Sequence, residues 1–206
     1  MGTKENFLKH LVDEERSCVL SNLQQLENAL KGLQYEGKTS SFHHIRKIEE
    51  IVLFLRKKYQ QHTNLDDEVV FPFLSKHIPR LYPTLQFLKM ERQDFQGLFE
   101  PFDKILSQLK EKNRILLRND FIEQLSNNGL YLICMLRSHI QIEEENVYKA
   151  IFQELHQDER NALQKEIEQF LLKENKRILK ENTDKKRLKK APFSWLKKKT
   201  HKLLQK

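Results

Sequence analysis

Glycine and proline are scarce in this sequence, and no long apolar run occurs in it. Only five glycines and five prolines are found among 206 residues, which leaves little turn chemistry for a β-sandwich or a barrel. Leucine, lysine, glutamate and glutamine are abundant instead, and these residues favour helices. At this length, one domain with an appendage is the expected organisation. We therefore predict an all-α chain.

Cysteine is equally scarce. The two cysteines, Cys18 and Cys134, lie within apolar helical patterns and form neither a CxxC pair nor a secreted disulfide framework. We therefore expect two buried thiols in a reducing compartment. No stretch of about 18 apolar residues is present, and residues 1–7 lack the apolar core of a signal peptide. These features predict a soluble, cytoplasmic protein.

Positive charge is concentrated at one end of the chain. The net charge is +8, but residues 175–206 carry 13 Lys and Arg against two acids, whereas residues 1–174 carry 24 bases and 27 acids. Residues 185–206 also include Phe193 and Trp195. Such a basic amphipathic tail could contact an anionic membrane surface, nucleic acid or an acidic protein, or it could be a solvated end. The first of these would make the protein peripheral to a membrane.

Four segments show apolar residues at alternating spacings of three and four, which one buried helix face produces. They cover roughly residues 4–34, 41–78, 83–109 and 119–153. Short connections between long helices favour an antiparallel, up-down four-helix bundle. A fifth helix is expected over residues 156–174. The predicted domains are residues 1–160 for the bundle and residues 161–206 for the additional helix and the basic tail.

Polar residues interrupt these apolar faces at matching heights. In an up-down bundle, the starts of the first and third helices lie level with the ends of the second and fourth. The interrupting residues should therefore converge on one layer of the core. They are Glu15, His62, Asp66, Glu91, His139 and Glu143. An isolated buried carboxylate costs several kcal/mol unless it is paired or metal-bound, so a cation is the simplest compensation.

The residue types in this layer indicate a site for two metal ions. His62 with Asp66, and His139 with Glu143, are spaced i and i+4, so each pair shares one helix face. Together with the two remaining glutamates they offer two nitrogens and four carboxylates, the ligand inventory of di-iron carboxylate bundles. Bridging carboxylates suit iron, or manganese as the alternative, better than a structural zinc.

The sequence around the two pairs resembles a known family. The stretch H-T-N-L-D-D-E-V-V-F-P at residues 62–72 is similar to the H-x-x-x-E-E-x-x-x-F-P element of hemerythrin-like (HHE) domains. The stretch H-I-Q-I-E-E-E-N-V-Y at residues 139–148 repeats it about 77 residues later. The resemblance covers residues 5–160 and implies a four-helix bundle with a non-haem di-iron centre. It implies that Asp66 and Glu143 bridge the irons. The histidine that opens each stretch would then be a terminal ligand.

The sequence departs from this family at two positions. Hemerythrins usually add a histidine in the first and third helices, where this chain has Glu15 and Glu91. Added carboxylates favour the ferric state, so this departure from the family points away from reversible oxygen carriage. It points to reaction with O₂, NO or peroxide, as an oxidase-like or oxygenase-like enzyme, a sensor or an iron-handling protein. Tyr59, one turn before the first histidine, is either a core aromatic residue or a donor near the metals.

A different class of function is also compatible with the sequence. The bundle could be a metal-free helical interaction module that its basic tail, residues 185–206, anchors to a membrane or a partner. In such a metal-free bundle, Arg16 or Arg92 would pair with the buried acids. No nucleophilic triad, P-loop or dinucleotide fingerprint is present.

Overall fold

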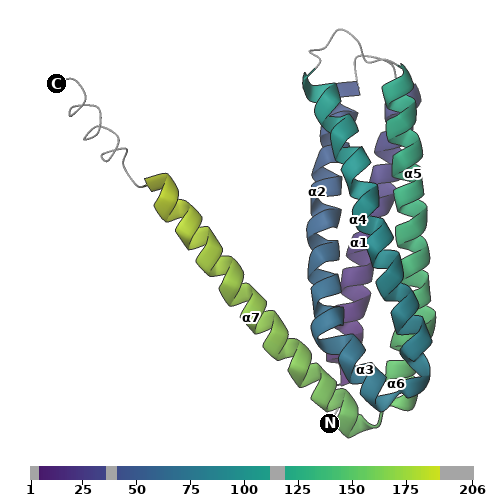
Figure 1. The fold of residues 1–206 in the computed structure, drawn as a ribbon, viewed down its shortest axis with the longest axis vertical. Helices are drawn as coiled ribbons and strands as arrows, with labels where there is room; N and C mark the ends of the chain where they lie inside the picture. Colours follow the sequence, from purple (N-terminus) through teal and green to yellow (C-terminus); the bar gives the residue numbers. More distant parts are fainter. Residues whose placement is uncertain (1–4, 36–40, 112–118, 191–206) are drawn as a thin grey trace, which may run out of the picture. The chain divides into compact units, whose positions relative to one another are not determined.

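Helices make up nearly all of the part of the chain that the structure describes. The computed structural model describes residues 5–35, 41–111 and 119–190, and every element in these ranges is a helix. The predicted all-α class is therefore confirmed. The four long helices lie side by side (Figure 1) and are α1 (Glu5–Tyr35), α2 (Ser41–Leu65), α4 (Tyr82–Glu111) and α5 (Asn119–Ile142).

Short helical elements follow α2, and short elements together with one 34-residue helix follow α5. After α2 come the π-helix η1 (Asp66–Val70), α3 (Phe71–His77) and the 3₁₀ turn η2 (Pro79–Leu81). After α5 come a second π-helix, η3 (Glu143–Tyr148), then α6 (Lys149–Glu154) and α7 (Gln157–Lys190). The sequence predicted the second and fourth segments as continuous helices. Each of them instead contains one wide π segment.

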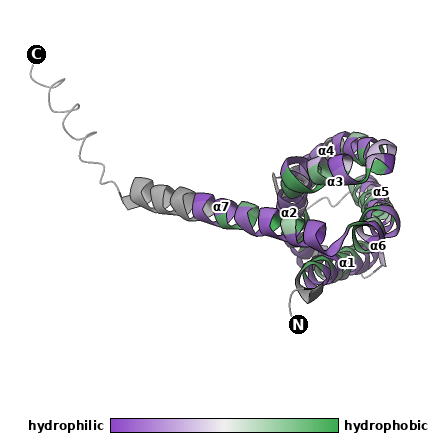
Figure 2. Ribbon diagram, turned by 90° about the horizontal axis from the view of Figure 1, so that it is seen from below, coloured by the Kyte–Doolittle hydropathy of each residue, from purple (hydrophilic) through white to green (hydrophobic). Residues whose placement is uncertain are grey.

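The long helices pack as a helical bundle. α1 contacts α2 and α5, and α4 contacts α5 and α2, so each long helix has two neighbours. Figure 2 shows them arranged around a common centre. The apolar faces that the spacing predicted fill this centre with fully buried side chains, among them Leu23, Ile48, Phe95, Phe102 and Leu125. Burial of this apolar surface is the main stabilising contribution to the bundle.

Both cysteines lie just outside the buried faces of their helices. Cys18 and Cys134 are exposed, so the prediction of buried thiols was wrong. Cys18 precedes Val19, which packs against the core, and Cys134 follows the buried Ile133. Successive residues of a helix are rotated by about 100°. A residue next to a buried position can therefore face solvent.

Residues 1–164 and 165–206 form two separate compact units. The first turns of α7 belong to the first unit, where Leu163 is fully buried. The predicted fifth helix over residues 156–174 is present, and α7 continues to Lys190. The rest of the predicted basic tail, residues 191–206, lies outside the described residues. None of the described helices is long and apolar enough to cross a membrane.

Candidate metal centre

The repeated sequence phrase folds in the same way twice. His62 lies in the last turn of α2, and Asp66 is the first residue of the π-helix η1. In α5 and η3, His139 and Glu143 occupy the same two positions. π segments inside α-helices are rare and occur frequently at functional sites. Each histidine faces the carboxylate one turn later, because their helix spacing places them on one face.

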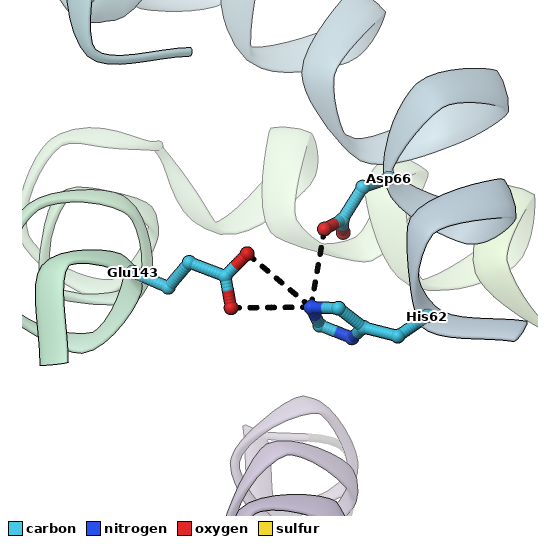
Figure 3. A group of neighbouring side chains, drawn as sticks. All are labelled: His62, Asp66 and Glu143. Carbon is cyan, nitrogen blue, oxygen red and sulfur yellow. Dashed lines mark hydrogen bonds and ion pairs between the residues drawn. The ribbon is translucent and has the colours of Figure 1, made fainter. Parts of the chain in front are cut away.

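Three of these side chains converge on one point. His62 Nε2 lies 3.1 Å from Glu143 Oε2, 3.3 Å from Glu143 Oε1 and 3.2 Å from Asp66 Oδ2. Figure 3 shows the three side chains pointing toward one another. One donor atom from each of them lies within 4.8 Å of the other two. The carboxylates of Asp66 and Glu143 are almost fully buried.

The second histidine, His139, contacts the same carboxylate, that of Glu143. His139 Nε2 lies 3.1 Å from Glu143 Oε1. Glu143 is therefore the residue that connects the two imidazoles. His139 Nε2 is buried, and it has no hydrogen-bond partner among the described residues. A buried imidazole nitrogen without such a bond is a donor available to a cation.

The two additional glutamates lie on the outer side of the imidazoles. Glu15 Oε2 is 3.7 Å from His62 Nδ1, and Glu91 Oε2 is 2.9 Å from His139 Nδ1. The structure thus brings all six predicted residues together. However, it places Glu15 and Glu91 at the ring nitrogens that face away from Glu143. A carboxylate in this position fixes the tautomer and the orientation of a histidine that binds metal through its other nitrogen.

Arg92 of α4 enters the centre as well. One of its terminal nitrogens, Nη2, donates to Asp66 and lies 3.4 Å from Glu143 Oε1, while Nη1 donates to Asp67 at 3.1 Å. The guanidinium carbon lies 4.5 Å from the centroid of the Phe71 ring. Arg92 is buried. The sequence suggested this residue only as a partner of the acids in a metal-free bundle.

Arg16, the other arginine considered for that role, lies elsewhere. It pairs with Glu144, and both side chains are more than a third exposed. Helix spacing places Arg16 beside the buried face of α1, and its long side chain reaches outward to the surface. Arg16 therefore does not neutralise the buried carboxylates. Among the described arginines, Arg92 has this contact with both Asp66 and Glu143.

The centre is strongly charged, and its groups change one another's pKa. Burial disfavours the imidazolium of His62, but the charges of Asp66 and Glu143 outweigh burial and raise its pKa well above the usual range. Burial likewise opposes the charge of His139, yet contacts with Glu143 and Glu91 raise its pKa. Without a metal, protons on these imidazoles would therefore help to neutralise the carboxylates.

The two central carboxylates respond in opposite directions. Burial would raise the pKa of Glu143, but the charge of His62 and close contacts with both histidines hold it well below its usual range. Burial raises the pKa of Asp66 to about 6, against the opposing charges of His62 and Arg92. Glu143 is thus the permanently ionised member of the pair. An ionised carboxylate between two imidazoles is suited to bind a cation.

The donor set matches a first-row transition metal. Imidazole nitrogens and carboxylate oxygens are ligands of iron, manganese and zinc, whereas structural zinc sites usually include cysteine. Neither described cysteine lies in this group. His62, Asp66 and Glu143 supply three converging donors, and the free nitrogen of His139 lies next to them. These residues fit a bound divalent cation.

A cavity of about 530 Å³ opens onto this centre. His62, His139 and Glu143 line one part of it, and apolar residues such as Val12 and Ile140 line another. Tyr59 also lines the cavity, and its buried hydroxyl has no hydrogen-bond partner among the described residues. A small molecule could reach the histidines through this space.

These features define a class of protein, namely a helical bundle with a buried imidazole and carboxylate centre for a cation. The family model for the hemerythrin HHE cation binding domain matches residues 10–151. The match covers more than half of the chain and includes all six predicted residues, so the chain belongs to this family. The family resemblance of the repeated phrase is thereby confirmed. Comparison with curated proteins and with solved structures gave no match.

Proposed function

We propose that this chain binds redox-active iron, with manganese as the alternative, and reacts with O₂, NO or peroxide. The observation that carries the proposal is the convergence of His62, Asp66 and Glu143 within 4.8 Å in a chain of the HHE cation-binding family. Iron held there would supply electron transfer to such a ligand. In a two-ion centre, His139, whose Nε2 lies 3.1 Å from Glu143, would bind the second ion.

The surrounding frame supports this assignment. We take it to be the antiparallel up-down bundle that the sequence predicts, because each long helix contacts two others. In that arrangement the ends of α2 and α5 meet the starts of α1 and α4. This matches the contacts of Glu15 with His62 and of Glu91 with His139. The bundle domain of residues 1–160 would then be the metal-binding unit.

The residues around the centre favour redox chemistry over reversible oxygen carriage. Glu15 and Glu91 replace histidines that hemerythrins usually have, and anionic groups near iron stabilise its ferric state. The cavity leads from apolar residues to the two histidines. The hydroxyl of Tyr59 could donate a hydrogen bond to a ligand held there. An oxidase-like enzyme, a sensor or an iron-handling protein would use these features.

Metal loading tests the proposal. The full chain is loaded anaerobically with Fe(II), desalted, and analysed for iron by mass spectrometry. We expect a stoichiometric amount of iron that is lost in the double variant His62→Ala, His139→Ala. The matched control is His10→Ala, because His10 also faces a carboxylate at i+4, Glu14, but on the exposed surface of α1. A wild-type chain that stays free of iron and manganese would refute the proposal.

A second candidate function rests on the concentration of charge at the end of the chain. Residues 175–206 carry 13 bases and two acids, and α7 ends in the basic residues 185–190. Such a segment suits an anionic surface, whether a membrane, nucleic acid or an acidic protein. Deletion of residues 185–206 should abolish binding to anionic liposomes or nucleic acid at low salt. Equal binding by the deleted chain would contradict this role.

A further inference from the structure

Arg92 holds the carboxylates that a second metal ion would need. The family resemblance assigns bridging roles to Asp66 and Glu143. In the structure, the Nη2 atom of Arg92 donates to Asp66 and lies 3.4 Å from Glu143 Oε1. A guanidinium keeps its positive charge at every physiological pH. A permanent cation is thus built into the space between the two bridging candidates.

Arg92 engages one oxygen of each bridging candidate, Asp66 Oδ2 and Glu143 Oε1, so neither carboxylate keeps both oxygens free to bridge two ions. His62 faces both oxygens of Glu143 and is flanked by Asp66. His139 faces Glu143 Oε1, which is the oxygen that Arg92 also approaches. An ion bound by His139 and Glu143 would therefore lie next to the guanidinium. Repulsion between two positive charges at such a short distance in a buried site is strong.

Two further contacts keep Arg92 in this position. Nη1 donates to Asp67 at 3.1 Å, and the guanidinium lies over the Phe71 ring at 4.5 Å. Stacking on an aromatic ring and a forked hydrogen-bond pattern restrict an arginine more than a lysine in the same place. Arg92 is also buried among these groups. Movement of Arg92 away from the centre would break several contacts together.

We infer that the centre holds a single cation at His62, Asp66 and Glu143, and that the guanidinium of Arg92 takes the place of the second ion. This inference rests on the proposed function, because it assumes that a cation binds at all. It replaces the pair of irons that the sequence predicts. A guanidinium neutralises carboxylates as a metal does, but it offers no site for an incoming ligand. Small molecules would then meet one metal ion and a fixed positive charge beside it.

The ratio of metal to protein tests this inference directly. The wild-type chain is loaded with Mn(II), and the bound metal is measured together with its EPR signal. We expect about one ion per chain with the spectrum of an isolated ion, because a carboxylate with one oxygen held by Arg92 can bind one ion but cannot bridge two. In Arg92→Met, which removes the charge and keeps an unbranched side chain, the ratio should rise toward two, with magnetic coupling between the ions.

Control variants separate the role of Arg92 from general effects. Arg56 has the same kinds of partner at the surface of the bundle, since it pairs with Asp103 and lies 5.2 Å from the Phe99 ring centroid. Arg56→Met should keep the wild-type ratio. Arg92→Lys retains the charge and should also keep the wild-type ratio of metal to protein. This variant is the one to measure if Arg92→Met does not fold.

The outcomes distinguish this inference from the proposed function. A coupled pair of ions in the wild-type chain would overturn the inference and leave the proposed function intact. Absence of any bound metal would overturn both. A single ion in the wild-type chain and also in folded Arg92→Met would overturn the role given to Arg92. A single isolated ion in the wild-type chain and in Arg92→Lys, with a coupled pair in Arg92→Met, supports the inference.

Discussion

Replacement of Arg92 by methionine should strongly destabilise the metal-free protein at neutral pH. Arg92, Asp66 and Glu143 form a buried group in which side-chain exposure is 7%, 3% and 5%, respectively. Arg92→Met retains most of the apolar stem but leaves two buried carboxylates without this cation. Removal of one partner from a buried ion pair costs about 3–5 kcal/mol. Loss of the contact with Phe71 adds about 0.5–2 kcal/mol.

The size of this effect should depend on pH in a defined direction. Burial raises the pKa of Asp66 to about 6, above its range in an unfolded chain. The folded state therefore binds this proton more tightly, and stability falls as pH rises from the unfolded pKa to the folded one. Without Arg92, which lowers this pKa, Asp66 would keep its proton to a higher pH. The variant should thus lose more stability at about pH 8 than at about pH 5.

Urea unfolding followed by circular dichroism, in the presence of a chelator, measures this loss. Arg56→Met is the matched control, because Arg56 and Asp103 are 40% and 43% exposed and such a pair contributes about 0–1 kcal/mol. Arg92→Met combined with Asp66→Asn should recover part of the loss, since one of the stranded charges is removed. An equal, small loss in both arginine variants would refute the idea that Arg92 neutralises the centre.

Three further predictions concern metal binding and access. Glu15→Gln should weaken metal binding by about 10–100-fold without abolishing it, because Glu15 faces the outer nitrogen of His62 at 3.7 Å and orients that imidazole; competition with a chelating dye measures the affinity. Ile140→Trp should slow the reaction with NO in stopped-flow measurements and leave the metal content unchanged, because Ile140 lines the cavity. Acid should release the metal. The raised pKa of His62 makes protons compete with the ion already above the usual histidine range, so affinity should fall as the pH is lowered from alkaline to acidic values.

Helix positions and buried faces could be predicted from the sequence because they depend on a repeated pattern. The apolar spacing identified each long helix, and most residues of those faces are buried. The convergence of six polar residues followed from their heights along the helices. Neither result required knowledge of side-chain rotamers. The cysteines show the limit of this approach, because a position next to a buried face can be assigned to either side.

The roles of the polar residues within the layer could not be read from the sequence. Helical spacing shows that Glu15 faces the core, but not which nitrogen of His62 it approaches. Arg92 follows Glu91 directly, so its position is rotated away from the apolar face by about 100°. Only its long side chain brings the guanidinium back to Asp66. Such reach depends on rotamers and on neighbours from other helices, such as the Phe71 ring.

The two π segments are better explained by the centre than by local sequence. In η1 the amide of Phe71 donates to the carbonyl of Asp66, five residues earlier, and Pro72 follows. Proline removes a backbone donor and could by itself disturb a helix there. However, η3 shows the same bond, from Lys149 to Glu144, and no proline follows it. In both copies a histidine is followed four residues later by a carboxylate, and further acidic residues come directly after that carboxylate. The widened turn therefore accompanies the inward-facing carboxylate in both helices, as expected if it positions that group for the centre.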